Sequence, residues 1–298
     1  MKTIATLILT TGIAVWAQGP PITHEPPMSG IHWAKGQAPP SGGAGTSPNP
    51  NYNGGPIMAT STTMAIFWGA SWGSSSFTGD KITGLDSFYS GINGSSYAAT
   101  CNEYGDSTGA KVTSASTYAG HIIDLSQAAK NGNRTTPILQ EVCTALANNH
   151  ITPVANGYYA VYTDTPRGHA NFCAWHSAGS CNGVNVQFAF FFSLDGDPGC
   201  DPDDTSGQHS QGLAALANVS GHEHSEARTD PRLNAWYDSS GAENSDKCAW
   251  TFGTPLLTFS NNTKWKIQGN WSNAAYNGNT GYPNSSGQNG CLDGGNYK

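Results

Sequence analysis

Charged residues are scarce in this sequence. Asp, Glu, Lys and Arg account for 11% of its 298 residues, and only 13 residues are basic. A protein that binds nucleic acid needs a basic surface to neutralise phosphates, and a net charge of −7 argues against such a surface. We therefore expect no nucleic-acid partner, and a surface that is polar mainly through Asn, Ser, Thr and Gly.

Long apolar runs are also missing beyond the N-terminus. A helix that crosses a membrane needs about 20 consecutive apolar residues, and no segment after residue 17 has them. Residues 3–15 are mostly apolar, follow Met1 and Lys2, and precede the small residue Ala17. This order is typical of a secretory signal peptide. We expect residues 1–17 to be removed and the mature chain to be secreted, extracellular and without a membrane span.

Cysteine is present in an odd number. The seven cysteines, at 101, 143, 173, 181, 200, 248 and 291, predict disulfide bonds in a secreted protein. Three bridges and one free thiol allow 105 arrangements, which is 7 choices of free cysteine times 15 pairings of the other six. We favour Cys248 with Cys291 and Cys101 with Cys143. Six Asn-X-Ser/Thr sequons also fit a glycoprotein, and they are Asn93, Asn133, Asn218, Asn261, Asn270 and Asn284.

The prolines are unevenly distributed along the chain. Residues 18–56 contain nine of the 17 prolines, with Gly, Ser and Asn between them. This composition is typical of a linker or a loosely wrapped arm. We predict that residues 57–298 form a single domain.

Strand and helix patterns are mixed within residues 57–298. Spacing and apolar runs predict strands over 64–68, 157–163, 184–194 and 264–271, and helices over 81–92, 136–149 and 208–227. The tail from residue 273 reads as a loop. We predict an α+β fold with a mixed or antiparallel sheet packed on helices. A strong strand followed by a helix with metal ligands is also the order in zincin-type peptidases, by analogy only.

The last of these helices carries the segment H-E-H-S-E at 222–226. His222 and Glu226 are four residues apart, so on a helix they project from one face and can share a metal ion. Glu223 can reach a water molecule activated by that metal and accept its proton. This is the chemistry of the H-E-x-x-H motif with Glu as the second ligand. One His combined with carboxylates suits Zn²⁺.

These residues also have a simpler interpretation, as solvated side chains on an amphipathic helix. Against it, many of the few charged residues crowd this stretch, and the preceding residues 213–221 are mostly small and apolar. That end of the helix should be buried, and buried polar groups need partners, which a metal supplies. His224 lies about 200° around the helix from His222, so we expect it at the surface or behind the ligands.

A third ligand is expected downstream of the helix. Asp238, Glu243 and Asp246 are the candidates. We predict Asp246, because a disulfide at Cys248 would hold its backbone in place. Glu243 is the alternative ligand, or else a hydrogen-bond partner of a ligand or of His176.

Two further patterns could carry chemistry. His169 and His176 lie on either side of Cys173, and we predict that His176 polarises a substrate, although an ordinary buried histidine fits equally well. Residues 69–73 spell G-x-S-x-G, the pattern of a serine nucleophile at Ser71. The residues that follow do not read as the helix that this motif requires.

Several segments together resemble the phosphate-induced protein 1 (Exordium-like) family. The main one is V-S-G-H-E-H-S-E-A-R-T-D-P-R-L-N-A-W-Y-D at 219–238 with E-x-x-D-x-C at 243–248, supported by G-G-P-I-M, F-C-A-W-H and I-Q-G-N-W-S-N elsewhere. The resemblance covers most of the chain after residue 56 and implies a secreted protein of the cell wall or apoplast. It places His222, Glu223, Glu226, Asn234, Trp236, Glu243, Asp246 and Cys248 on motif positions. Plant members tend to have Asn at the position of Asp230, which speaks against Asp230 as a ligand.

Two functions of different classes fit these residues. The first is a secreted zinc-dependent hydrolase, most simply a zincin-type metallopeptidase acting on an extracellular peptide, protein or wall polymer. His222, Glu226 and Asp246 would bind zinc, and Glu223 would be the general base. The second is a non-catalytic extracellular protein with a structural metal or polar cluster. A closed site would favour the second function and an open position in a cleft the first, while a serine hydrolase using Ser71 comes third.

Overall fold

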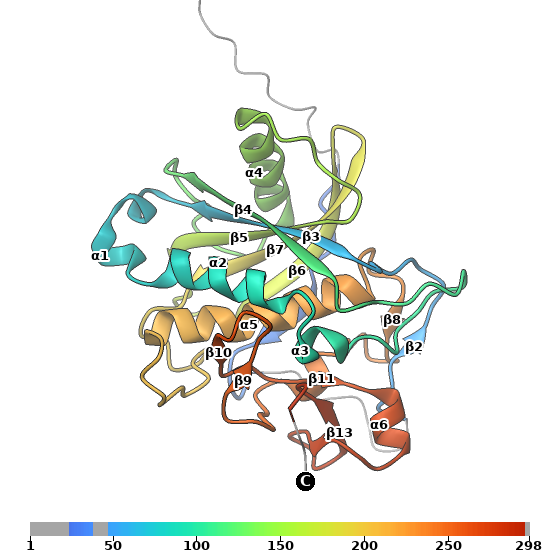
Figure 1. Cartoon of the computed structure of the whole chain (residues 1–298). Helices are drawn as coiled ribbons and strands as arrows, with labels where there is room; N and C mark the ends of the chain where they lie inside the picture. Colours follow the sequence, from blue (N-terminus) through green and yellow to red (C-terminus); the bar gives the residue numbers. More distant parts are fainter. Residues whose placement is uncertain (1–23, 38–46, 296–298) are drawn as a thin grey trace, which may run out of the picture.

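A six-stranded sheet forms the centre of the molecule (Figure 1). The computed structural model describes residues 24–37 and 47–295, so the predicted signal peptide lies outside the described residues. The strand order is β1-β6-β7-β5-β3-β4. These strands are β1 (Ser29–Trp33), β3 (Ser61–Trp68), β4 (Ser116–Asp124), β5 (Gly157–Pro166), β6 (Phe172–Cys181) and β7 (Val184–Ser193).

The sheet is mixed in direction. Strands β4, β3, β5 and β7 pair in parallel, and β6 and β1 add two antiparallel strands at one side. The predicted mixed sheet packed on helices is confirmed. The alternative prediction of an antiparallel sheet is wrong for β4, β3, β5 and β7, which pair in parallel. In β7 the run from residue 186 to 192 is buried on both faces, which is the pattern of a strand covered by helices on each side.

Helices cover both faces of this sheet. Figure 1 places α4 (Thr135–Asn148) on one face and the packed pair α2 (Lys81–Ile92) and α5 (Gln211–Thr229) on the other. All three helices were predicted from the 3.6-residue spacing, whereas β4 and β6 were not predicted. The shorter helical turns are η1 (Ala70–Gly73), α1 (Ser75–Thr78) and α3 (Ser96–Ala99).

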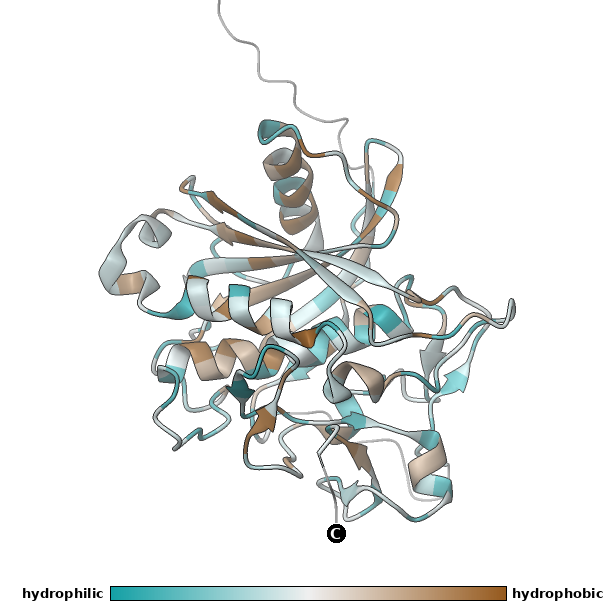
Figure 2. Cartoon of the chain, in the orientation of Figure 1, coloured by the Kyte–Doolittle hydropathy of each residue, from teal (hydrophilic) through white to brown (hydrophobic). Residues whose placement is uncertain are grey.

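Helix α5 is almost completely buried. Its N-cap Ser210 accepts a hydrogen bond from the main-chain N–H of Leu213, and it ends at Thr229, before Asp230 and Pro231, where a residue that precedes proline is disfavoured in a helix. The first half is apolar and packs on the sheet, while the second half is polar (Figure 2). Because both halves are buried, the polar half must find its partners inside the protein.

Strand β1 belongs to the stretch that the sequence predicted to be a loose arm. It pairs antiparallel with β6 at one edge of the sheet. The prediction of an arm or linker over residues 18–56 is therefore wrong for Ser29–Trp33. The reason is that I-H-W completes a sheet edge, although prolines flank it on both sides in the sequence.

The chain after α5 folds into short elements below that helix (Figure 1). The predicted strand over 264–271 is in fact two short strands in different sheets, separated by residues 266–269. The tail expected to be a loop contains one helix and two strands. The elements after α5 are β8 (Trp236–Tyr237), η2 (Asp246–Cys248), β9 (Leu257–Thr258), β10 (Lys264–Trp265), β11 (Asn270–Trp271), α6 (Asn273–Asn277), β12 (Tyr282–Pro283) and β13 (Asn289–Leu292). The earlier strand β2 (Asn51–Tyr52) pairs antiparallel with β8.

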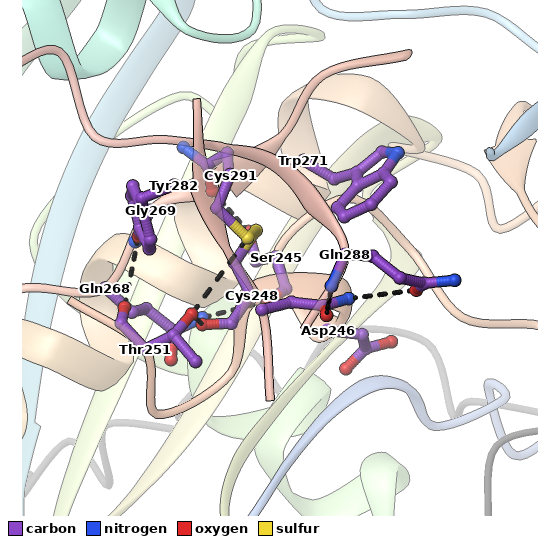
Figure 3. The surroundings of a disulfide bond; sticks show 12 residues. Ser245, Asp246, Cys248, Thr251, Gln268, Gly269, Trp271, Tyr282, Gln288 and Cys291 are labelled. Carbon is purple, nitrogen blue, oxygen red and sulfur yellow. Dashed lines mark hydrogen bonds between the residues drawn. A yellow bond between two sulfur atoms is a disulfide. The ribbon is translucent and has the colours of Figure 1, made fainter. Parts of the chain in front are cut away.

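Three disulfide bonds connect these elements. They are Cys143–Cys181, Cys173–Cys200 and Cys248–Cys291, and Cys101 is free and buried. The predicted Cys248–Cys291 bridge is confirmed, and Cys101–Cys143 is wrong because Cys143 on α4 pairs with the end of β6. Figure 3 shows the Cys248–Cys291 bridge tying η2 to β13 close to Asp246.

The disulfides are compatible with a secreted protein. In the part of the chain that the structure describes, no helix has both the length and the apolar character needed to cross a membrane. Two of the sequon asparagines, Asn218 and Asn270, are fully buried and cannot carry a glycan in this fold.

Candidate metal centre

Three side chains predicted to be metal ligands come together at the polar end of α5. His222 Nε2 lies 3.2 Å from Glu226 Oε2 and 3.5 Å from Asp246 Oδ1. Ligand atoms of all three residues lie within 4.8 Å of one another. A tetrahedral zinc ion with bonds of about 2.0 to 2.2 Å separates neighbouring ligand atoms by roughly 3.3 to 3.6 Å. The observed spacing is therefore close to what such an ion requires.

Gln268 and His32 hold the ring of His222 from behind. The Gln268 side-chain amide nitrogen lies 3.0 Å from His222 Nδ1, and its oxygen lies 2.8 Å from His32 Nε2. The His32 ring also packs on the His222 ring at 4.3 Å. These contacts direct Nε2 of His222 towards the carboxylates. For Nε2 to bind a metal, Nδ1 must carry the proton, so the Gln268 amide must turn to present its oxygen.

Asp246 is positioned by the loop that leads into η2. Its main-chain N–H donates to Glu226 Oε1 at 2.9 Å, and its Oδ2 accepts the main-chain N–H of Glu243 at 3.0 Å. The Cys248–Cys291 bridge starts two residues later. Asp246 Oδ1 thus remains directed towards His222, which agrees with Asp246 as the third ligand.

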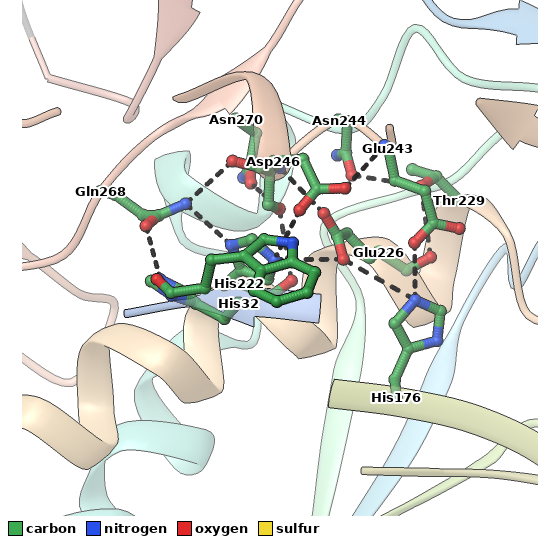
Figure 4. Close-up of polar contacts among 12 residues, drawn as sticks. His32, His176, His222, Glu226, Thr229, Glu243, Asn244, Asp246, Gln268 and Asn270 are labelled. Atoms are coloured by element: carbon green, nitrogen blue, oxygen red, sulfur yellow. Dashed lines mark hydrogen bonds and ion pairs between the residues drawn. The ribbon is translucent and has the colours of Figure 1, made fainter. Parts of the chain in front are cut away.

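Glu243 instead lies against His176. The two side chains are hydrogen-bonded at 2.6 Å between Nε2 and Oε2, and His176 Nε2 is also 3.7 Å from Glu226 Oε2. Figure 4 shows His176 from β6 directed at the same Glu226 carboxylate that faces His222. Glu243 therefore has the hydrogen-bonding place that the sequence offered as its alternative, and His176 contacts the ligand cluster from inside.

Glu223 is fully buried beside this cluster. Neither of its oxygens has a hydrogen-bond partner of normal geometry among the described residues, although the main-chain N–H of His32 favours its charged form. Burial, with Glu226 and Asp246 nearby, raises the pKa of Glu223 well above its ordinary value, and the nearby His222 opposes this shift. A carboxyl group in this environment is ready to hold a proton.

The whole cluster carries an excess of buried negative charge. Burial and the neighbouring Asp246 raise the pKa of Glu226 to about 7, and burial with Glu226 and Asp230 raises that of Glu243 well above its ordinary value. Burial alone would lower the pKa of His222, but Glu226 and Asp246 raise it well above its ordinary value. Burial lowers the pKa of His176 to about 3. A bound cation would relieve this excess.

Unpartnered atoms at the centre are a second indication of a cation. Within the described residues, His222 Nε2 and Glu226 Oε2 make no hydrogen bond of normal geometry, although both residues are fully buried, and they meet only each other, as an ion pair at 3.2 Å. Buried polar atoms normally have partners, and each exception costs free energy. Since these are two of the three proposed ligand atoms, the residues present fit a divalent metal ion.

Strand β1 covers the cluster. A Cβ atom on Gly30 would lie 2.1 Å from His176 Cδ2 and 2.2 Å from Glu226 Oε2, so only glycine allows the strand to pass this closely. Gly30 also has a φ of 51°, which favours glycine. The Asp246 side chain, 20% exposed, is the one proposed ligand with contact to solvent. Two surface pockets, one lined by Asp164 and the other by Arg167, lie elsewhere and include none of the proposed ligands.

The remaining candidates lie outside the cluster. His224 is buried on the other side of α5 against Ser61, at 3.1 Å, so it does not share a metal with His222, but the surface position considered for it is wrong. Asp238 pairs with Lys247. Ser71 lies in η1 rather than before a long helix, and His169 lines a separate surface pocket.

The sequence did not reveal Gln268, His32 or Gly30 as parts of this centre. Gln268 lies within the supporting motif I-Q-G-N-W-S-N, which is the one signal that pointed to it. His32 and Gly30 lie in the proline-rich stretch, where composition indicated an arm. Their roles depend on the pairing of β1 with β6, which no local pattern predicts.

Removing the Cys248–Cys291 bridge should weaken metal binding as well as the fold. We expect the double Ser variant to lose about 2 to 4 kcal/mol in denaturant unfolding and to bind zinc less tightly, because Asp246 is no longer held in place. The matched control is the Cys143–Cys181 pair, whose sequence separation of 38 is close to the 43 of Cys248–Cys291. Its Ser variant should lose similar stability with unchanged zinc affinity. Equal zinc affinity in both variants would contradict this role.

The metal-free protein should lose stability as the pH rises from 6.5 to about 8. Glu223, Glu226 and Glu243 have raised pKa values, so the folded chain holds protons that the unfolded carboxylates have released by pH 6.5, and His222, whose pKa is also raised, keeps its proton in the folded chain while the unfolded histidine loses it. Raising the pH therefore favours unfolding. The buried histidines with lowered pKa values, His32, His176 and His224, act in the opposite direction only near pH 6.5, where an unfolded histidine is still partly protonated. Urea midpoints after chelation measure this. Added zinc should reverse the trend, because deprotonated ligands bind it. Equal urea midpoints at pH 6.5 and pH 8 in the metal-free protein would contradict this prediction.

No model of a known protein family matches the chain, and no curated protein matches it in sequence. The resemblance to the phosphate-induced protein 1 family therefore stays a prediction.

Proposed function

We propose that this protein is a secreted, zinc-dependent hydrolase of the metallopeptidase type. The observation that carries the proposal is the convergence of His222, Glu226 and Asp246 with a free, fully buried carboxyl group at Glu223. When bound there, zinc would polarise a carbonyl group and lower the pKa of a water molecule. Two sequence-based predictions also support the proposal. They are the zincin-like order of a strong strand followed by a helix with metal ligands, and the predicted secretion of the chain.

The chain's own residues have separate tasks in this proposal. His222, Glu226 and Asp246 would hold the ion, and Gln268 fixes the ring of His222. Glu223 has a raised pKa while no cation is bound; beside a bound cation it would be ionised, so it would accept the proton of the attacking water and pass it to the leaving group. His176, which contacts Glu226 and Glu243, orients the ligand carboxylate rather than polarising the substrate directly.

Access to this site depends on β1. The strand pairs with β6 and passes directly over Glu226 and His176, so the described conformation is a latent one. If β1 moves away, the edge of β6 becomes free to pair with an extended chain. A peptide or protein substrate is therefore the class that the surroundings favour.

A second function, a non-catalytic extracellular protein with a structural metal, is favoured by the burial of the cluster. His222, Glu223 and Glu226 are all fully buried beneath β1. A metal at a closed site adds to stability rather than to catalysis. The two functions differ in whether β1 can be displaced without losing the fold.

Replacement of Glu223 by Gln separates these functions. The amide fills the same space and leaves the metal ligands intact, but it cannot accept a proton. We expect zinc content to be unchanged and peptide hydrolysis to fall by about 100- to 10,000-fold. Glu141→Gln, a buried glutamate on α4 away from the cluster, is the control and should keep full activity. Undiminished hydrolysis by Glu223→Gln would remove Glu223 from the mechanism.

Gly30→Ala should displace β1 and open the centre. The new methyl group would overlap His176 and Glu226, so the strand must move. We expect faster loss of zinc to a chelator and several-fold higher hydrolysis by the purified protein. Gly36→Ala is the matched control, because Gly36 also has a positive φ, of 73°, but no atom lies within 4 Å of the added Cβ. Equal chelation rates in the two variants would mean that β1 does not limit access.

A further inference from the structure

We propose that the centre holds two divalent metal ions and that Glu226 bridges them. The first ion is the one proposed above, at His222, Glu226 and Asp246. The second would lie between His176 Nε2, Glu226 Oε2 and a carboxylate oxygen of Glu243, a group whose ligand atoms also lie within 4.8 Å of one another. This inference rests on the proposed metal centre but does not depend on its being catalytic.

The position of Glu226 Oε2 is the geometric basis of this proposal. This single atom is 3.2 Å from His222 Nε2 and 3.7 Å from His176 Nε2, so two imidazole rings from different elements face it. Glu226 Oε1 is already occupied by the main-chain N–H of Asp246. Carboxylate-bridged pairs of metal ions lie about 3.5 to 4 Å apart. Two rings that face one carboxylate can supply the outer ligands of such a pair.

The number of buried carboxyl groups around Glu226 also favours a second ion. One divalent ion would neutralise Glu226 and Asp246 and leave Glu223, Asp230 and Glu243 together in the interior. Among the described residues, the basic side chains in close contact with Glu226, Glu243 and Asp246 are all histidines, and one of them, His176, is neutral because burial lowers its pKa to about 3. Buried carboxylates without a cation are costly, and they are relieved either by a proton or by a metal. A second divalent ion removes most of the remaining charge.

The His176–Glu243 hydrogen bond by itself leaves this region incomplete. It satisfies Glu243 Oε2, but Glu243 Oε1 accepts no hydrogen bond from an N–H or O–H group of the described residues, although the side chain is 1% exposed. The hydrogen bond between the carboxyl groups of Glu243 and Asp230 requires a shared proton. A second ion would replace that proton at Glu243.

The donor set indicates the class of metal. The second group supplies one imidazole nitrogen and carboxylate oxygens, as the first group does. Imidazole with carboxylates suits zinc, cobalt, manganese or ferrous ions rather than calcium, which prefers oxygen ligands alone. We therefore infer two ions of the first transition row, bound in equivalent one-histidine environments.

The test is a titration of the chelated, full-length mature protein with Co²⁺. The visible absorption of bound Co²⁺ and the metal content after desalting measure the number of ions per chain. We expect two equivalents in the unaltered protein, and a magnetically coupled pair by electron paramagnetic resonance. Glu243→Gln and His176→Ala should each reduce the number to one and abolish the coupling. His121→Ala, a histidine paired with Asp86 outside the cluster, should keep two.

Each outcome decides the matter. Saturation at one equivalent in a folded protein, unchanged by Glu243→Gln, would overturn the second site and leave the first intact. Absence of any bound cobalt would overturn both the second site and the proposed metal centre. Two ions without hydrolysis, in the Gly30→Ala variant as well as in the unaltered protein, would support this inference and count against the catalytic function. If His176→Ala does not fold, as judged by circular dichroism, the isosteric Glu243→Gln carries the test alone.

Discussion

The burial of His222 and Glu226 on one face of α5 is the constraint on which the rest of the structure depends. A helix with a polar second half would normally turn it to solvent, but here sheet, loops and edge strand enclose it. Once the pair is buried, every neighbouring group must either supply a hydrogen bond or share a cation. The elements around α5 supply such groups, because each brings a side chain that contacts His222 or Glu226.

The segments after α5 satisfy one side of the cluster. The loop before η2 brings Asp246 and Glu243 to Glu226, and the Cys248–Cys291 bridge anchors it to β13. Gln268 comes from the turn between β10 and β11 and reaches behind His222. Both segments, which have little regular structure of their own, thus gain a fixed position from polar contacts with one helix.

Strands β6 and β1 cover the side of the cluster that faces the sheet. His176 on β6 reaches the cluster from within the sheet, and β1 is added at the edge where Gly30 permits close approach. This arrangement shields the carboxylates from water and so strengthens every electrostatic interaction among them. It also makes the N-terminal segment the element whose movement would change the site most.

The sequence by itself determined the helices, the strongest strands and the triad of candidate metal ligands, His222, Glu226 and Asp246. The helices follow from 3.6-residue spacing, and His222 with Glu226 follows from helical geometry alone, because residues four apart must share a face. Asp246 was found because a cysteine two residues away implied a fixed backbone. The tertiary structure alone decided the disulfide of Cys143, the mixed direction of the sheet, the place of β1, and the meeting of His176, Glu243 and Gln268 with the triad. These depend on contacts between residues far apart in the chain, and no local pattern of apolar or polar side chains records which distant segment a strand or a loop will meet.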